Sequence, residues 1–312
     1  MDQAATSPSL VTAGRPLAGL VQGERAVHER ERHVHRAVLL QACGEGKPLF
    51  IFPGSSGSPL SFADLASRLG RNRPVYAFHS VGIQSECEPV RRMEPLARLY
   101  VAEILDHQPS GPYFLFGYSV GGVLAFEAAR ELLSRGERVA VVIMADCAAP
   151  GYPRLAPWQV RARAHLRNLV TLSPRARLHY LQERLARRTN RVLTWLEVTP
   201  ILRERQATAL LAQSVDEALD EAYDHYQPAQ LSTNVLFITA DTPPDWPATD
   251  FDDPLMGWGS VLRGHTAQCH VPGTHLSIFE PDNVPVLAER MSEALSQAEA
   301  GYAPDGSWHV AS

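Results

Sequence analysis

The most constraining feature of this chain is a series of short apolar runs that alternate with segments of helical periodicity. The apolar runs lie at 48–52, 75–78, 113–116 and 139–144, and the helical patterns at 62–69, 93–107 and 123–134. Such alternation is typical of a mostly parallel sheet with helices on its faces. The run at 139–144 is continuously apolar, which indicates a strand buried on both faces at the centre of that sheet. The sequence therefore predicts an α/β fold.

The alternation stops after residue 150. Residues 151–228 contain several amphipathic stretches but no convincing strand, and a long helical insertion between the strands of such a sheet commonly forms a lid. An apolar run returns at 235–239, a strand-like run lies at 267–271, and a helical pattern follows at 284–295. The sheet is therefore predicted to resume after the insertion.

These patterns divide the chain into five segments. We expect an α/β core at 37–150 and 229–300, interrupted by a helical lid insertion at 151–228. Residues 1–36 are polar and aperiodic and are predicted to form a flexible N-terminal arm. Residues 301–312 are predicted to be a C-terminal tail.

Composition limits the partners that the chain can have. Its net charge is −5, whereas binding to nucleic acid usually requires a clustered basic surface, so no nucleic-acid partner is expected. The four cysteines are scattered without a C-x-x-C pair, which argues against a structural metal site and a disulfide framework. No segment approaches the ~18 uninterrupted apolar residues of a membrane span, and no signal peptide is recognisable. We therefore expect a cytoplasmic protein without a bound metal or a membrane contact.

The pattern G-x-S-x-G occurs at Gly117, Ser119 and Gly121, between the apolar run 113–116 and the helical pattern 123–134. This placement indicates a tight strand-to-helix turn that exposes the serine hydroxyl. Glycine is needed at both flanks because a side chain would collide with the neighbouring strand and helix. The helix N-terminus would also help to stabilise an oxyanion formed above Ser119. The motif predicts an α/β-hydrolase fold with Ser119 as the nucleophile.

A serine hydroxyl is a poor nucleophile unless a base removes its proton, and in this fold the partners follow in the order serine, acid, histidine. Among twelve histidines, His275 is the best candidate because it lies on a loop after a predicted strand and before the terminal helix. His265 and His270 are alternatives, although His270 belongs to the strand-like run. The sequence predicts His275 as the base.

Two aspartates compete for the role of the acid. Asp146 follows the apolar run 139–144, and Asp241 follows the later run 235–239. Either carboxylate could orient an imidazole and stabilise its cation. Spacing along the chain does not choose between them.

A second donor to the oxyanion is expected from the loop after the first predicted strand. That loop, residues 53–57, has the sequence Pro-Gly-Ser-Ser-Gly, whose small residues let backbone N–H groups approach a reacting carbonyl. We expect the donor to be the N–H group of Ser55, with Ser56 as the next candidate.

Several segments together resemble the thioesterase domains that end nonribosomal peptide and polyketide assembly lines, and their free-standing relatives. The resemblance extends over about residues 37–296, and the segments that carry it are 47–54, 75–78, 111–113, 117–122, 145–146, 226–228 and 273–275. It implies an α/β-hydrolase fold, in which residues 151–228 cover an acyl-binding channel.

The resemblance also bears on individual residues. In this family the acid lies on the strand after the nucleophile helix, which favours Asp146 over Asp241. The backbone N–H group of Val120 is implied as the first oxyanion donor. Tyr118 replaces the histidine common in editing thioesterases, which indicates the product-releasing subgroup. The loop at 53–57 departs from the usual family pattern, which has a second proline or an Ala-Gly pair.

The implied substrate is an acyl, peptidyl or polyketide chain carried on the phosphopantetheine arm of a carrier protein, with no bound cofactor. Ser119 would take the acyl group from the thioester, and water or a nucleophile on the chain would release it by hydrolysis or macrocyclisation. Two other functions stay open: a stand-alone esterase or acyltransferase of the same fold, and a catalytically inactive binding protein.

Overall fold

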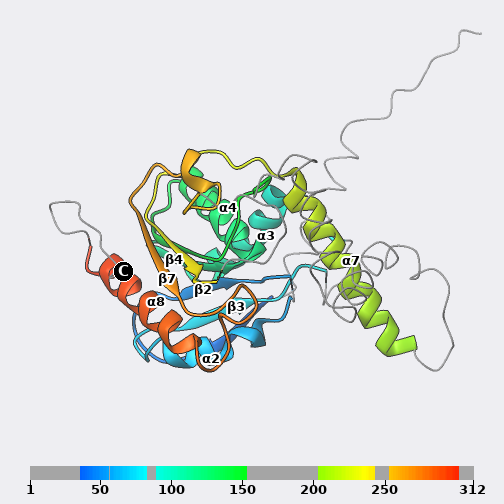
Figure 1. Cartoon of the computed structure of the whole chain (residues 1–312), viewed down its shortest axis with the longest axis horizontal. Helices are drawn as coiled ribbons and strands as arrows, with labels where there is room; N and C mark the ends of the chain where they lie inside the picture. Colours follow the sequence, from blue (N-terminus) through cyan, green and yellow to red (C-terminus); the bar gives the residue numbers. More distant parts are fainter. Residues whose placement is uncertain (1–35, 56, 83–88, 153–202, 243–252, 302–312) are drawn as a thin grey trace, which may run out of the picture. The chain divides into compact units, whose positions relative to one another are not determined.

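A computed structural model of the chain describes residues 36–55, 57–82, 89–152, 203–242 and 253–301 (Figure 1). All of these residues belong to one compact unit. None of the helices described there has the length and apolar character that a membrane crossing requires.

Seven strands form one sheet in the order β1-β3-β2-β4-β5-β6-β7. The strands are β1 (Ala37–Gln41), β2 (Leu49–Phe52), β3 (Val75–Phe78), β4 (Tyr113–Tyr118), β5 (Val139–Ala145), β6 (Val235–Ala240) and β7 (Thr266–Val271). β1 pairs antiparallel with β3, and the other pairings are parallel. This mostly parallel sheet confirms the predicted α/β-hydrolase fold class.

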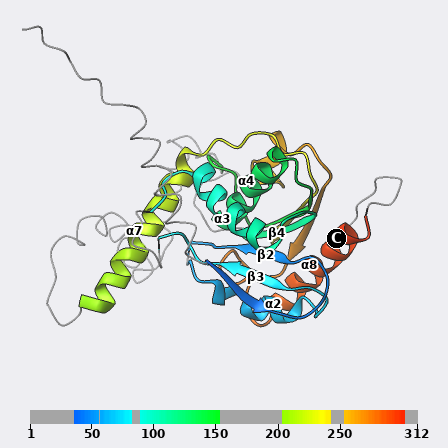
Figure 2. The same cartoon turned by 180° about the vertical axis from the view of Figure 1, so that it is seen from behind.

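Helices cover both faces of the sheet (Figures 1 and 2). One face carries α3 (Met93–His107) and α4 (Val120–Ser134), and the other carries α2 (Ala63–Arg68) and α8 (Val284–Glu299). Two short 3₁₀ helices, η1 (Pro59–Phe62) and η3 (Trp258–Ser260), lie in the connections. The strands therefore lie between two helical layers.

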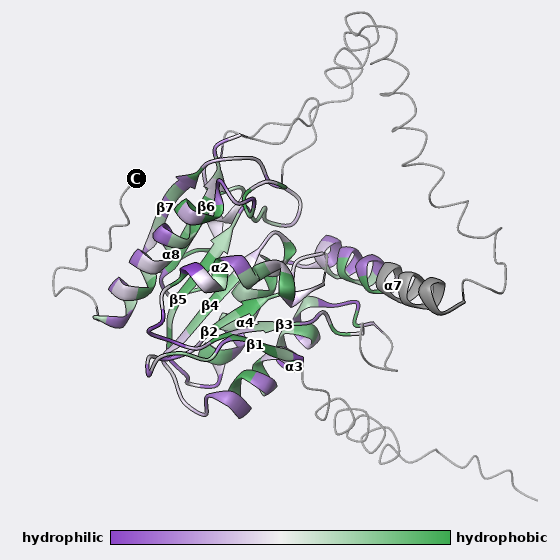
Figure 3. Ribbon diagram, turned by 90° about the horizontal axis from the view of Figure 1, so that it is seen from below, coloured by the Kyte–Doolittle hydropathy of each residue, from purple (hydrophilic) through white to green (hydrophobic). Residues whose placement is uncertain are grey.

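The continuous apolar character of the central strands follows from this layering. In β4, Tyr113 and Leu115 pack in the core on the α3 and α4 side, whereas Phe114 and Phe116 pack on the α2 and α8 side. Successive side chains of a strand point to opposite faces, so a strand covered on both faces needs apolar residues at every position. Figure 3 shows hydrophobic residues along the strands and hydrophilic residues on the outer sides of the helices.

The predicted lid lies largely outside the described residues. Its final part forms the helix α7 (Arg203–His225). Most of the predicted N-terminal arm, 1–36, and of the predicted tail, 301–312, also lies outside them. The lid, the arm, the tail and the segment boundaries at 37–150 and 229–300 stay predictions.

Two tyrosines fasten the C-terminal end of α7 to the core. The hydroxyl of Tyr223 donates hydrogen bonds to the carbonyl oxygens of Ala148 and Ala149, at 3.1 and 3.2 Å. The hydroxyl of Tyr226 donates a hydrogen bond to a carboxylate oxygen of Glu127, in α4, at 2.5 Å. Burial, followed by the nearby Glu127 carboxylate, raises the pKa of Tyr226, so its phenol keeps the donor proton. The end of α7 is thus attached to the helix that begins at the candidate nucleophile.

Tyr226→Phe is expected to lower the free energy of unfolding by about 2 kcal/mol, because it removes a donor from a buried carboxylate. Glu127 would keep its ion pair with Arg130, at 2.7 Å, which limits the loss. The measurement is urea denaturation of the variant beside Tyr223→Phe, which loses bonds to neutral carbonyls worth about 1 kcal/mol. A Tyr226→Phe protein that is as stable as wild type would show that the contact to Glu127 contributes nothing.

Candidate active site

The candidate catalytic residues gather at the edge of the sheet where the parallel strands end. β4 ends at Tyr118 and β5 at Ala145, and these two residues are direct partners in the sheet. The N–H group of Ser119 donates to the carbonyl oxygen of Ala145 at 3.0 Å, which holds Ser119 beside Asp146. The loop that carries His275 follows β7 at the same edge. In open α/β sheets, ligands bind outside this edge.

The backbone at Ser119 makes a sharp turn between β4 and α4. Its φ is 55° and its ψ is −130°, a conformation that non-glycine residues rarely adopt. A Cβ atom on Gly117 would lie 1.9 Å from the carbonyl oxygen of Gly121, and one on Gly121 would lie 2.8 Å from the carbonyl oxygen of Pro53. Strand and helix therefore approach too closely for side chains at these two positions, and the turn lifts the residue between them to the surface of the sheet.

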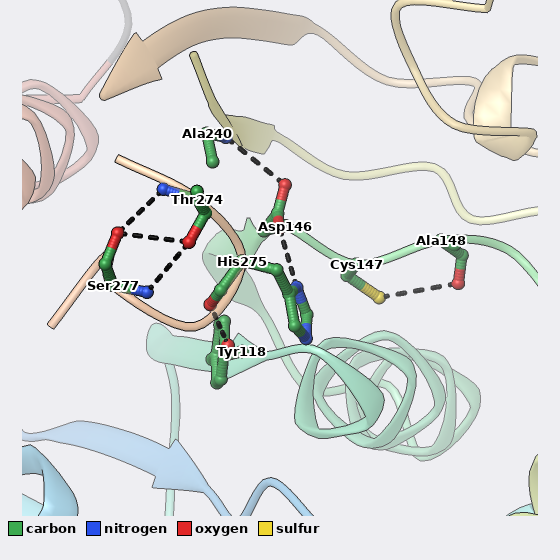
Figure 4. A network of polar contacts seen from close by, with 8 residues as sticks. All are labelled: Tyr118, Asp146, Cys147, Ala148, Ala240, Thr274, His275 and Ser277. Carbon is green, nitrogen blue, oxygen red and sulfur yellow. Dashed lines mark hydrogen bonds and ion pairs between the residues drawn. The ribbon is translucent and has the colours of Figure 1, made fainter. Parts of the chain in front are cut away.

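Asp146 and His275 form a short, partly buried hydrogen bond (Figure 4). His275 Nδ1 lies 2.6 Å from Asp146 Oδ2, and the side chains are 33% and 6% exposed. The other carboxylate oxygen, Oδ1, accepts a hydrogen bond from the N–H group of Ala240 at 3.2 Å. Because the carboxylate accepts, Nδ1 carries the proton, which leaves Nε2 of a neutral imidazole as an acceptor. Figure 4 shows this second ring nitrogen on the side of the ring away from Asp146, toward the start of α4.

The remaining sequence candidates, Asp241, His265 and His270, lie outside the pair that Asp146 and His275 form. The carboxylate of Asp241 is exposed and, among the described residues, makes no hydrogen bond or ion pair with His275. His265 precedes β7 and lies at the opposite edge of the sheet. His270 is an exposed residue of β7, and its Nδ1 lies 2.9 Å from Thr239 Oγ1. Of the two candidate aspartates, Asp146 is therefore the one whose carboxylate contacts the imidazole of His275.

The candidate oxyanion loop lies beside the turn. A Cβ atom on Gly54 would be 3.6 Å from the ring and from the carbonyl oxygen of Tyr118, and the Pro53 carbonyl lies against Gly121. Ser55 is exposed in this loop, and Ser56 lies outside the described residues. Val120 is the first residue of α4. Both expected donors are therefore near Ser119 in the chain's fold, and their roles as donors stay predictions.

Tyr118 contacts the candidate base in a way that sequence reasoning missed. Its ring stacks on the imidazole of His275, with centroids 4.9 Å apart and an interplanar angle of 28°. Its hydroxyl donates a hydrogen bond to the backbone carbonyl oxygen of His275 (Figure 4). The sequence marks Tyr118 only as a subgroup indicator, and no local pattern signals a contact with a residue so distant in the chain.

In the part of the chain that the structure describes, no group of three or more His, Cys, Asp or Glu side chains could hold a metal ion.

The family model for the thioesterase domain matches residues 47–295. The non-reducing polyketide synthase PKS16 of Cladonia grayi is 33% identical over 287 residues, which cover 86% of this chain and 13% of that synthase. The inactive atromentin synthetase invA4 of Paxillus involutus is 27% identical over 289 residues, which cover 89% of this chain and 29% of that protein. The chain thus spans only a small part of these relatives.

Solved structures show the same fold. A four-domain nonribosomal peptide synthetase, holo-AB3403, matches with a TM-score of 0.61 and 24% identity, over 85% of this chain and 21% of that one. The NocB thioesterase domain from the nocardicin cluster matches with a TM-score of 0.58 and 18% identity, over 84% of this chain and 100% of that one. With the match of the family model to most of its length, the chain belongs to the thioesterase domain family, whose other members include domains of nonribosomal peptide and polyketide synthases.

Proposed function

We propose that this chain is a serine-dependent thioesterase that releases an acyl, peptidyl or polyketide chain from a carrier protein's phosphopantetheine thioester. The observation that carries the proposal is the 2.6 Å contact between His275 and Asp146, at the sheet edge where Ser119 also lies. Membership in the thioesterase family supports the substrate class. The relatives that are multidomain synthases support a carrier protein as the partner.

In the first half of the proposed reaction, Nε2 of His275 takes the proton of the Ser119 hydroxyl as the oxygen attacks the thioester carbonyl. Asp146 keeps the imidazole in the tautomer that has Nε2 free and stabilises the cation that forms. The backbone N–H groups of Val120 and Ser55 hold the negative oxygen of the tetrahedral intermediate. When the C–S bond breaks, the phosphopantetheine thiol leaves with the proton from His275 and the acyl group stays on Ser119 as an ester.

In the second half, a nucleophile resolves the acyl-Ser119 ester with His275 again as the base. Water gives hydrolysis, and a hydroxyl or amine on the acyl chain gives macrocyclisation. The residues of this chain supply the whole mechanism, so no bound cofactor is proposed, and phosphopantetheine arrives with the substrate. The scattered cysteines fit a cytoplasmic location.

The proposal is tested by comparing turnover of an acyl-N-acetylcysteamine or acyl-pantetheine thioester with that of a nitrophenyl ester of the same acid. We expect a higher kcat/KM for the thioester. We also expect a fluorophosphonate probe to add one phosphonyl group to the peptide that contains Ser119, as read by mass spectrometry. Product masses separate hydrolysis from macrocyclisation.

Two outcomes would support a different function. A clear preference for the nitrophenyl ester would indicate a stand-alone esterase, and capture of the acyl group by an added amine or alcohol would indicate an acyltransferase. Absence of any adduct in folded protein would indicate a binding protein that has lost the chemistry.

A further inference from the structure

The last residue of β4, Tyr118, holds the candidate base from two directions. Its ring lies on the face of the His275 imidazole, with the centroids 4.9 Å apart, and its hydroxyl donates to the backbone carbonyl oxygen of the same residue. One contact therefore acts on the side chain and the other on the backbone. Figure 4 shows Tyr118 beneath the loop that carries His275.

The Tyr118 ring is itself held in place by other aromatic rings. Phe279 meets it edge-on, with centroids 4.8 Å apart and an angle of 85° between the planes. Phe279 in turn contacts Phe62 of η1, at 5.5 Å and 80°. Edge-on pairs of this kind are favourable because the positive ring edge faces the negative ring face. Burial, and secondarily the charge of Asp146, raise the pKa of Tyr118, so its hydroxyl stays protonated and remains a donor.

The imidazole needs such support because its bond to Asp146 constrains only one ring atom. Besides the covalent bond at Cγ, this hydrogen bond holds only Nδ1, and a tilt of the ring plane about these two points moves Nε2 away from its target. A stacking partner on the ring face opposes this tilt. Misplacement of a catalytic group by about 1 Å can reduce a rate about 100-fold.

Hydrogen bonds within the loop of His275, residues 272–283, define its conformation. The N–H group of Thr274 donates to Ser277 Oγ at 2.8 Å, and the N–H group of Ser277 donates to Thr274 Oγ1 at 3.3 Å. The N–H group of Thr242, just after the end of β6, donates a hydrogen bond to the carbonyl oxygen of Gly273 at 3.0 Å. The contacts of Tyr118 join the same loop to β4, the strand that leads into the turn at Ser119.

We infer that Tyr118 is a positioning residue that sets the place of the His275 imidazole relative to Ser119. Tyr118 precedes Ser119 in the chain, so a contact from Tyr118 to His275 links the nucleophile and the base through a single peptide bond. The inference rests on the proposed function, since it assumes that His275 is the base. Tyr118 acts through His275 and is not assigned a chemical step.

Two substitutions separate the two contacts. Tyr118→Phe keeps the ring stack and removes the hydrogen bond, and it is expected to reduce kcat and the rate of fluorophosphonate labelling by roughly 5- to 10-fold. Tyr118→Leu removes both contacts and is expected to reduce these rates about 100-fold. KM is expected to change by less than about twofold in both variants, because an interaction that acts on the chemical step leaves substrate binding unchanged.

Tyr113→Phe is the matched control. Tyr113 is the first residue of β4, and its buried hydroxyl donates to the backbone carbonyl oxygen of Gln108 at 3.0 Å. The substitution therefore removes a hydrogen bond to a backbone carbonyl oxygen at the opposite end of the same strand, together with the interaction of the hydroxyl with Glu137. We expect a loss of stability at least as large as that of Tyr118→Phe, and wild-type rates. Equal loss of rate in both phenylalanine variants would show a general effect of stability and overturn the inference.

A readout that needs no turnover keeps the inference separate from the proposed function. The short bond to Asp146 should give the Nδ1 proton of His275 a low-field NMR resonance, identified by its loss in His275→Gln. We expect this resonance to persist in Tyr113→Phe and to weaken or broaden through exchange in Tyr118→Leu. An unchanged resonance and unchanged labelling in Tyr118→Leu would overturn the inference. Absence of labelling in wild type would instead count against the proposed function.

Discussion

Ser119→Ala is expected to abolish fluorophosphonate labelling and to reduce thioester turnover by roughly 10⁶-fold, the size of effect seen when a serine protease loses its nucleophile. The substitution removes the oxygen atom that forms the acyl ester and leaves the Cβ atom in place. The Ser119 side chain makes no capping hydrogen bond to α4, so the fold should not depend on its hydroxyl. The measurements are intact-protein mass spectrometry after labelling, kcat on the thioester, and urea denaturation.

Ser134→Ala is a suitable control for this experiment. Ser134 ends α4, far from the turn, and its hydroxyl donates only to the carbonyl oxygen of Glu131, at 2.8 Å. We expect the control to label and to turn over as wild type does. Labelling that survives in Ser119→Ala would place the nucleophile at another residue.

Asp146→Asn is expected to reduce kcat by roughly 10⁴-fold, with a parallel loss in the rate of labelling. An amide cannot stabilise the imidazolium as a carboxylate does, and it can turn its NH₂ group toward Nδ1, which favours the wrong tautomer. The fold should tolerate the change, because asparagine is one of the residues that adopt a positive φ, and φ at this position is 45°. Asparagine can also keep the acceptor for the Ala240 N–H group. Single-turnover acylation followed by mass spectrometry measures the effect.

Asp241→Asn provides the comparison for Asp146→Asn. Asp241 also follows a parallel strand, β6, but its side chain is exposed. We therefore expect its conversion to asparagine to leave kcat within about twofold of wild type, as is usual for surface substitutions. Loss of activity in Asp241→Asn together with retention in Asp146→Asn would reverse the assignment of the acid.

Local patterns predicted most strands because burial on both faces demands continuous apolar runs. The predicted ends of the strand and the helix on either side of Ser119 were less accurate. The strand predicted at 113–116 extends to Tyr118, and the helix predicted from 123 begins at Val120. Glycine has low helix propensity, so Gly121 and Gly122 disfavour a helix locally. Tertiary packing overrides that preference. Glycine is required at position 122 because a Cβ atom there would lie 2.7 Å from the Cβ and Sγ atoms of Cys147.

The first strand, β1, is an element that local sequence patterns do not predict. No strand is predicted at 37–41, yet β1 occupies this segment and pairs antiparallel with β3. Its residues are mostly half-buried, and Leu39 is 46% exposed, so the segment lacks the fully apolar pattern that marks the inner strands. An edge strand is recognised through its hydrogen bonds to a neighbour, and these depend on residues far away in the chain.

The sequence by itself determined the fold class, the family and the turn that presents Ser119, because each of these depends on short local patterns and on their order along the chain. Only the tertiary structure decided which aspartate meets His275. Asp146 and Asp241 follow adjacent parallel strands, and the choice depends on where a loop more than 30 residues after Asp241 folds back. The stack of Tyr118 on His275 joins residues 157 positions apart. Contacts of that range have no local signature, since they arise only when the sheet brings separate strand ends together.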